Sequence, residues 1–167
     1  KSNEITAIPE LLQLLDLQGA LVSIDAMACQ TKIAKTIIEQ KGDYLLAVKG
    51  NQGNLSKAVQ QAFSALRNDA SSLEALQTEK QHGRIESRLC QVLDASTLEG
   101  NFSRWKGLKT LAMITSFRTE KGKPVSMEYR YYISSRIMSA EQVASAVREH
   151  WAIESMHWVL DVSMQED

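Results

Sequence analysis

Hydrophobic and polar positions follow two different patterns along this chain, and the first of them is helical. Apolar side chains recur three and four positions apart over residues 4–17, 28–41 and 54–66, the spacing of amphipathic helices. Short apolar runs at 20–25 and 44–48 lie between these segments and are typical of buried strands. Helices that alternate with buried strands predict an α/β fold with parallel strand packing.

The pattern changes in the second part of the chain. Residues 67–79 are polar, small and only weakly periodic, which predicts a loop with some helix. Three later runs have the composition of strands: 84–93, 110–117 and 126–133. The turn Glu120-Lys121-Gly122-Lys123 predicts that the last two runs form a hairpin. A long helix then begins at Ser139, which has capping-box spacing with Gln142.

Composition describes an ordinary globular chain. Its 167 residues are 44% hydrophobic and 23% charged, enough for one domain with a core. The formal net charge of −1 gives no overall basic character, so a polyanionic partner must be recognised by local patches. Cys29 and Cys90 match no metal-binding or redox spacing, and neither a signal peptide nor a membrane-spanning run is evident. We therefore expect a cytoplasmic protein without a membrane partner. The absence of an initial methionine suggests a piece of a longer protein.

Two carboxylates have surroundings suited to chemistry. Asp25 ends the apolar run 20–25, and Glu154 lies in the helical stretch 150–158 far along the chain. An acid at the tip of a buried strand and an acid on an amphipathic helix are a common way to build a divalent-metal site. Oxygen ligands of this kind suit Mg²⁺ or Mn²⁺.

The final helix carries a stripe of ionisable side chains beside its apolar face. Its members are spaced four, three and four positions apart and share one face: His150, Glu154, His157 and Asp161. The stripe is either a solvated face or a ligand face on which Glu154 binds metal and its neighbours support it. A third interpretation takes Glu154-x-x-His157 as a di-metal helix-bundle motif, but no second copy of that motif is present.

Polar residues also follow the second predicted strand. Lys49, Asn51 and Gln52 lie where this strand meets the next helix, a place suited to phosphate or DNA contact. An ordinary turn with a helix cap explains them equally well. Gln30, just beyond Asp25, is a candidate for orienting a ligand.

Several segments, in the same order from one end to the other, resemble a single protein family. They are Ser2–Pro9, Ser23–Gln30, Asp43–Gln52, His82–Arg88, Tyr131–Ser135 and Arg148–Asp167. The family is that of bacterial insertion-sequence transposases that includes the H-repeat-associated proteins. The resemblance covers essentially the whole chain.

The resemblance implies a DDE transposase with a ribonuclease-H-like catalytic core, in which two Asp and one Glu hold two divalent ions. Asp25 matches the second acid and Glu154 the third, while the first Asp would lie upstream of this chain. Residues 1–79 would then be the central part of the core, without its early strands. Residues 80–137 would be a β-rich insertion or sheet extension, and 138–167 the catalytic helix.

The family pattern also bears on DNA contact. It favours a DNA-binding role for His82, Arg84 and Arg88, although these side chains could instead pair with Glu86 and nearby acids. Family members carry an Arg four positions before the Glu, where this chain has His150. Within the family a Lys also lies seven positions after the Glu, where this chain has Asp161. In those proteins the Arg and the Lys help to position DNA.

Two classes of function remain open at this stage. The first is an Mg²⁺- or Mn²⁺-dependent transposase that cleaves and joins DNA, acting as a homodimer, with this isolated fragment inactive because the first Asp lies upstream. The second is an inactive transposase remnant that serves as a DNA-binding or interaction module. The near-neutral charge favours the second, and retention of Asp25 and Glu154 favours the first.

Overall fold

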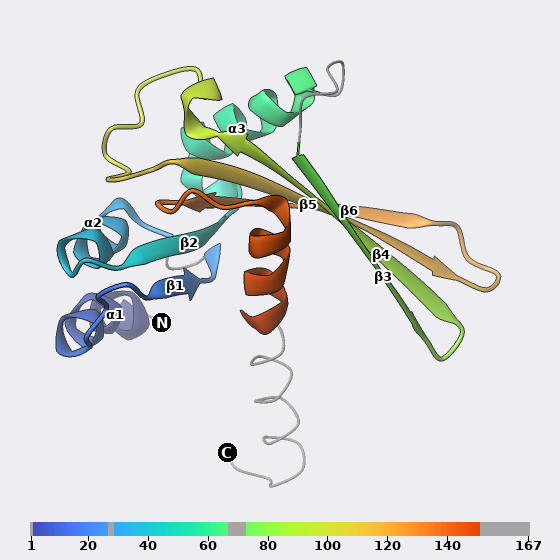
Figure 1. Ribbon diagram of the computed structural model, residues 1–167, viewed down its shortest axis with the longest axis horizontal. Coiled ribbons are helices and arrows are strands. Elements are labelled where there is room, and N and C mark those ends of the chain that lie inside the picture. The colour runs from blue at the N-terminus through green and yellow to red at the C-terminus, as the bar shows by residue number, and fades with distance from the viewer. Residues whose placement is uncertain (1, 27–28, 67–72, 151–167) are drawn as a thin grey trace, which may run out of the picture.

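The computed structural model describes residues 2–26, 29–66 and 73–150 as one mixed sheet with helices on both faces (Figure 1). The sheet has six strands in the order β1-β2-β6-β5-β4-β3. Their bounds are β1 Leu21–Ile24, β2 Asp43–Val48, β3 Leu73–Gln81, β4 Arg84–Asp94, β5 Thr110–Glu120 and β6 Ser126–Ser134. The mixed α/β class expected from the sequence is confirmed.

The prediction of parallel packing holds for one strand pair and is wrong for the rest of the sheet. β1 and β2 are parallel, whereas β2–β6, β6–β5, β5–β4 and β4–β3 are all antiparallel. Tight turns join β3 to β4 and β5 to β6, and turns of that length can connect only antiparallel neighbours. β6 then returns beside β2, so that β4–β6 continue the same sheet as β1 and β2.

The first three helices lie close to their predicted positions. Their bounds are α1 Ser2–Leu14, α2 Thr31–Glu39 and α3 Gly53–Leu66. α1 begins earlier than predicted, and Pro9 lies inside the helix, where its missing N–H removes one intrahelical hydrogen bond. Two short 3₁₀ turns, η2 Gly50–Gln52 and η3 Ala95–Thr97, follow β2 and β4. The last helix begins at residue 140 and is described to residue 150.

Strand β3 replaces much of the predicted 67–79 loop. It pairs along its length with β4, from Leu73 opposite Val92 to Gln81 opposite Arg84. The turn between them is His82-Gly83, and both residues have positive φ, the conformation that a two-residue hairpin turn requires. The strand was missed because it is an edge strand whose side chains are mostly polar, so it lacks an apolar run.

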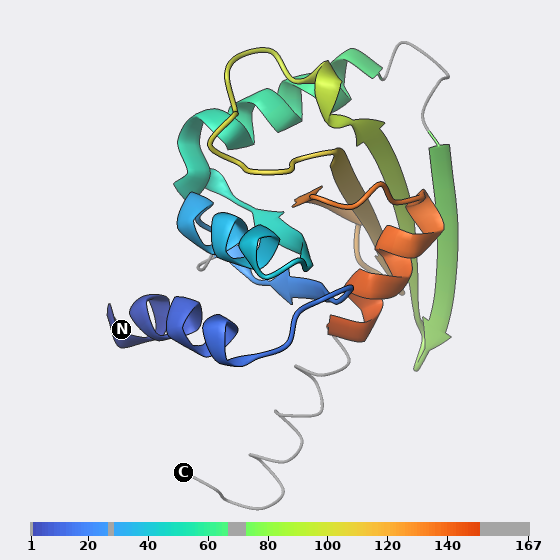
Figure 2. The ribbon, with the colours of Figure 1, turned by 60° about the vertical axis from the view of Figure 1, so that its left-hand side comes forward.

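The sheet separates two apolar cores. Val22, Leu46 and Ile133 belong to the face that α1, α2 and α3 cover, together with Ile33, Val59 and other fully buried side chains. Leu45, Ala112 and Tyr132 belong to the opposite face, which Val143 and Val147 of the last helix cover. Figure 2 shows α1–α3 and the last helix on opposite sides of the strands. Each fully buried Ile, Leu or Val contributes about 1.5–3 kcal/mol of transfer free energy.

Polar groups tie β2 to β6 at one end of this strand pair, in a set that we name the Asp43 cluster: Asp43, Ser135 and Arg136. The Ser135 hydroxyl donates to Asp43 Oδ1 over 2.8 Å and accepts from the Tyr44 N–H over 2.9 Å. Arg136 Nε donates to Asp43 Oδ2 over 3.1 Å, and its Nη2 donates to the Gly19 carbonyl. The cluster therefore also fixes the start of β1.

The far ends of β3–β6 project away from α1–α3 as a twisted extension, which we name the arm (residues 76–88 and 116–130; Figure 1). Its two faces differ because strand side chains alternate. The face continuous with the last helix is charged, and there Glu86 pairs with Arg84, Arg88 and Arg118. The opposite face is apolar and exposes Leu76, Ile85, Val125 and Met127.

No helix in the described part of the chain is long and apolar enough to cross a membrane.

Candidate active site

Asp25 lies immediately after β1, at the carboxyl end of the one parallel strand pair. Its side chain is exposed, and Oδ1 accepts a hydrogen bond from the Ala26 N–H over 2.6 Å. An acid does end a short strand here, but the prediction of a buried strand is wrong, because β1 is the edge strand of the sheet and its side chains are only half-buried. Ligand sites in sheets with parallel strands form outside such carboxyl ends.

A pocket of about 460 Å³ opens around this end of the sheet. Strands β1, β2 and β6 and the last helix all contribute to its wall. Its polar lining consists of Ser23, Asp25, Lys49, Glu128, Arg130, Tyr132 and His150. The pocket therefore combines two carboxylates, two permanent cations, a hydroxyl, a phenol and an imidazole.

The last helix meets β1 through its final described residue. His150 Nδ1 lies 3.1 Å from the Ser23 hydroxyl, a contact between residues 127 positions apart in the chain. Ser23 and Asp25 alternate with Ile24 and so share one sheet face. The contact brings His150, the first residue of the predicted ionisable stripe, to the pocket that Asp25 lines.

Tyr132 forms the floor of the polar pocket, with its side chain 7% exposed. Burial raises the pKa of its phenol to about 12. The positive charge and hydrogen bond of Arg130 act in the opposite direction, while the negative charge of Asp25 raises this pKa further. Tyr132 is consequently a neutral hydroxyl near neutral pH and lies within electrostatic range of Asp25.

The residues after β2 brace the loop that follows Asp25. Asn51 Nδ2 donates to the Ala26 carbonyl over 3.1 Å, and Gln52 Nε2 donates to the Ala26 and Cys29 carbonyls. Lys49 is exposed and caps η2, since its N–H donates to Gln52 Oε1 over 2.8 Å. The side-chain amides thus connect the loops after β1 and β2, and Lys49 faces the pocket.

Gln30 lies directly before α2, and its carbonyl accepts from the Ala34 N–H. Its predicted ligand-orienting role stays a prediction. Cys29 is a small buried core residue, and burial raises the pKa of its thiol to about 12.

The second basic group predicted from the sequence lies on the arm. Arg84 and Arg88 share a strand face and both donate to Glu86 over 2.9 Å, which is the ion-pairing alternative considered above. His82 lies in the turn and not on that strand face, because its positive φ redirects the backbone there. A groove of about 870 Å³ includes all three residues.

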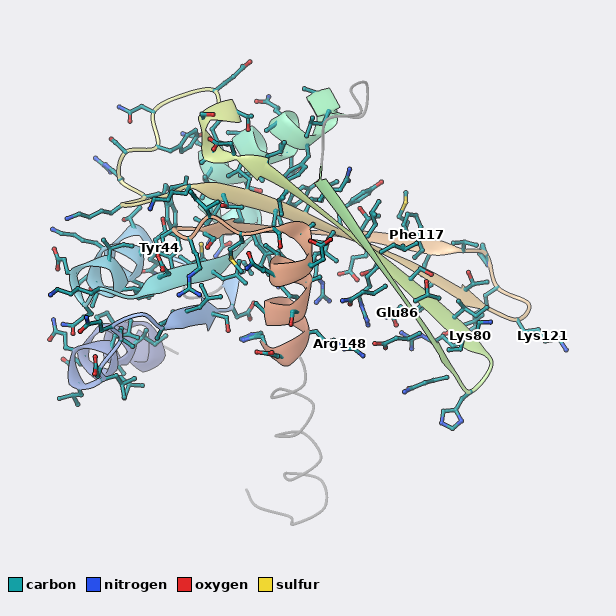
Figure 3. The ribbon with its side chains drawn as sticks, viewed as in Figure 1. Tyr44, Lys80, Glu86, Phe117, Lys121 and Arg148 are labelled. Atoms are coloured by element: carbon teal, nitrogen blue, oxygen red, sulfur yellow. The ribbon has the colours of Figure 1, made fainter. Side chains whose placement is uncertain are left out.

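The charged face of the arm is connected to the last helix. Arg148 Nη2 lies 2.6 Å from Glu79 Oε1, and Glu79 also pairs with Arg88 at 3.6 Å. Figure 3 shows the Arg148 side chain directed towards the hairpin of β3 and β4.

Three predicted site residues, Glu154, His157 and Asp161, lie outside the described residues. Among residues 2–26, 29–66 and 73–150, no group of three His, Cys, Asp or Glu side chains is close enough together to hold a metal ion. The described part therefore provides Asp25 as a strand-tip carboxylate but not a complete ligand set.

Sequence reasoning missed Ser23, Glu128, Arg130 and Tyr132. The last three alternate along β6, which was a usable signal that they share one face. The register of β6 against β2 was not readable, however, and it is this pairing that brings them beside Lys49 and Asp25.

With this geometry established, the comparisons with known proteins identify the class. The model of the transposase DDE domain family matches residues 1–167, so the chain belongs to that family.

The relatives are bacterial. Over its whole length the chain is 50% identical to "Putative protein YbfL" and 49% identical to "H repeat-associated putative transposase YhhI", both of Escherichia coli strain K12. It is also 50% identical to "Putative transposase YncI" of Escherichia coli O157:H7. The matches cover 46%, 46% and 44% of these proteins, so the chain spans about half the length of the relatives it matches.

Proposed function

We propose that this chain forms part of the catalytic core of an insertion-sequence transposase that cleaves and joins DNA phosphodiester bonds. The core would be ribonuclease-H-like, with residues 1–79 and 138–167 as its parts and 80–137 as its β-rich extension. Membership of the transposase DDE domain family supports this reaction class. The observation that carries the proposal is Asp25 at the tip of β1, lining one pocket with His150 of the last helix.

Asp25 and Glu154 are the proposed metal-binding acids. The helical spacing predicted from the sequence puts Glu154 on the same face as His150, which contacts Ser23 beside Asp25. Carboxylate oxygens fit the preference of Mg²⁺ or Mn²⁺, and a further acid is expected from outside this chain. Two such ions, when bound, activate the attacking oxygen and stabilise the leaving one.

The rest of the pocket fits a DNA substrate. Lys49 and His150 would contact the backbone next to Asp25, while Asn51 and Gln52 keep the Asp25 loop in place. The charged face of the arm lies on the same side of the sheet, so Arg84 and Arg88 would contact DNA farther from the reaction centre, and His82 would do so from the adjoining turn.

We also propose self-association through the opposite face of the arm. Four large apolar side chains are exposed there, from Ile85 at 41% to Leu76 at 68%. On that face of the described arm Lys80 is the one charged residue, so two copies can meet without strong repulsion. Several large apolar side chains exposed on one face commonly mark an interaction site.

The test is Mn²⁺-dependent nicking of supercoiled DNA by the complete gene product. Asp25→Asn and Glu154→Gln should each abolish nicking, whereas Asp16→Asn and Glu99→Gln, at other sites, should not. Nicking retained in the first two variants would disprove the proposed site. DNA binding without any nicking by the unaltered protein would support the inactive-remnant alternative, acting as a DNA-binding or interaction module.

A further inference from the structure

We propose that Arg130 and Tyr132 of β6, together with Lys49 of the loop after β2, form the subsite that binds the phosphodiester group undergoing reaction beside Asp25. This inference rests on the proposed function. It adds two residues from a strand that the family resemblance did not assign to the site.

Strand register provides the first support. Val48 pairs with Tyr131 and Ala47 with Tyr132 across β2 and β6, so Arg130 is opposite the position that follows β2, which is Lys49. Arg130 and Tyr132 share a sheet face, and both line the pocket with Lys49 and Asp25. Two cations from neighbouring strand ends thus lie beside the tip of β1, both on its β2 side.

The side chains of Arg130 and Lys49 have the chemistry needed to bind a phosphodiester. A guanidinium binds phosphate oxygens through a planar fork of N–H donors, and an ammonium adds a compact positive charge. Tyr132 adds a neutral O–H donor in the same pocket, close enough to Arg130 for its positive charge to lower the pKa of the phenol. Charge and donors therefore converge on one wall of the pocket.

The acidic groups of the pocket do not prevent anion binding. Glu128 Oε1 accepts from Arg130 Nε over 3.3 Å, but the two side chains are 58% and 43% exposed. Exposed pairs of this kind contribute only about 0–1 kcal/mol, so a phosphate can compete for the guanidinium. Asp25 is the other carboxylate of the pocket, and its proposed cations would neutralise its charge.

The experiment separates binding from reaction in the complete gene product. Binding of a labelled DNA duplex is measured by fluorescence anisotropy at several salt concentrations, with Ca²⁺ in place of Mn²⁺ so that the carboxylates keep a cation. Nicking of supercoiled plasmid is measured with Mn²⁺. The variants are Arg130→Ala, Arg130→Lys and Tyr132→Phe, with Lys35→Ala, an exposed α2 cation, as a charge control. Thermal unfolding of each variant confirms that it folds.

We expect Arg130→Ala to lower nicking about 100-fold, as loss of a donor to a reacting oxyanion does. Its log Kd against log salt slope should fall by about one, as for loss of one phosphate contact. Arg130→Lys should recover part of the rate, Tyr132→Phe should lower nicking about 10-fold, and Lys35→Ala should change neither quantity.

Two contrary outcomes are distinguishable. If the unaltered protein nicks DNA and Arg130→Ala matches it in rate and salt slope, the subsite is disproved and the proposed function stands. If the unaltered protein does not nick DNA, the proposed function fails. The salt slope of Arg130→Ala relative to Lys35→Ala then still decides whether Arg130 contacts phosphate. If Arg130→Ala does not fold, the nicking rates of Arg130→Lys and Tyr132→Phe decide, because neither variant removes a charge and the salt slope is then uninformative.

Discussion

The two ends of the β2–β6 strand pair contain similar chemical groups in opposite arrangements. At the Asp43 end, a carboxylate, a hydroxyl and a guanidinium bind one another and the adjacent backbone. At the Asp25 end, carboxylates, a hydroxyl and cations line the wall of an open pocket. Residue type alone therefore does not distinguish a structural polar cluster from a binding site. The difference is whether the polar groups bond one another, as at the Asp43 end, or line an open pocket, as at the Asp25 end.

The largest expected effect comes from the same substitution at each end. Asp25→Asn should lower Mn²⁺-dependent nicking at least about 100-fold without lowering the melting temperature, because this carboxylate is exposed. Asp43→Asn should weaken two hydrogen bonds, cost about 1–2 kcal/mol and lower the melting temperature by roughly 2–8 °C. Plasmid nicking and calorimetry of both variants check the pair. If Asp25→Asn and Asp43→Asn lowered nicking equally, the proposed distinction between the two ends would be wrong.

Serine substitutions compare the ends by stability alone. Ser135 is 2% exposed, and Ser135→Ala would leave the Tyr44 N–H and one Asp43 oxygen without this partner, at a cost of about 1–3 kcal/mol. Ser23→Ala removes a part-buried hydroxyl and should cost about 1 kcal/mol or less. Urea unfolding of the two variants measures the difference. A larger loss at Ser23 would indicate that the pocket end is the more tightly structured one.

A tyrosine at each end allows a titration test. Burial raises the pKa of Tyr44 and of Tyr132, the latter from 10.0 to about 12. The associated stability is fully present below pH 10 and is lost as the pH rises through 12, because the unfolded phenol releases its proton first. Arg130→Ala should raise the Tyr132 pKa further and leave Tyr44 unchanged. Phenolate absorbance during alkaline titration, compared with a Tyr132→Phe variant, reports this shift.

The smallest expected effect concerns the arm, whose apolar face is exposed. Met127 is 53% exposed, so Met127→Lys should change the free energy of unfolding by no more than about 0.5 kcal/mol. It should nevertheless weaken self-association, because it adds charge to an almost uncharged face. Sedimentation velocity over a concentration series is the measurement. Thr119→Lys, at another position on that face, is a second variant, and unchanged association in both would disprove the proposed contact.

The sequence predicted what local pattern determines. Helical spacing located α2 and α3, apolar runs located β1 and β2, and the Gly122 turn located the β5–β6 hairpin. β3 was missed because its side chains are polar on both faces near the turn, and tertiary pairing with β4 is what makes it a strand.

The site was predictable to the same extent. Asp25 could be recognised because a strand end is a local feature. Arg130 and Tyr132 could not, since their place beside Lys49 depends on the register of strands distant in the sequence. The predicted roles of Glu154, His157 and Asp161 stay predictions.

That distant pairing has a consequence for how the protein folds. The hydroxyl of Ser134 donates to the Tyr44 carbonyl across 90 positions of chain, and His150 meets Ser23 across 127. Contacts of such high sequence separation slow folding, whereas the β3–β6 meander joins neighbouring segments and can form early. On a ribosome, Asp25 emerges long before the strand and helix that surround it. The pocket is then among the last parts of the domain to assemble. A nascent chain would contain Asp25 before β6 and the last helix are present to complete the pocket.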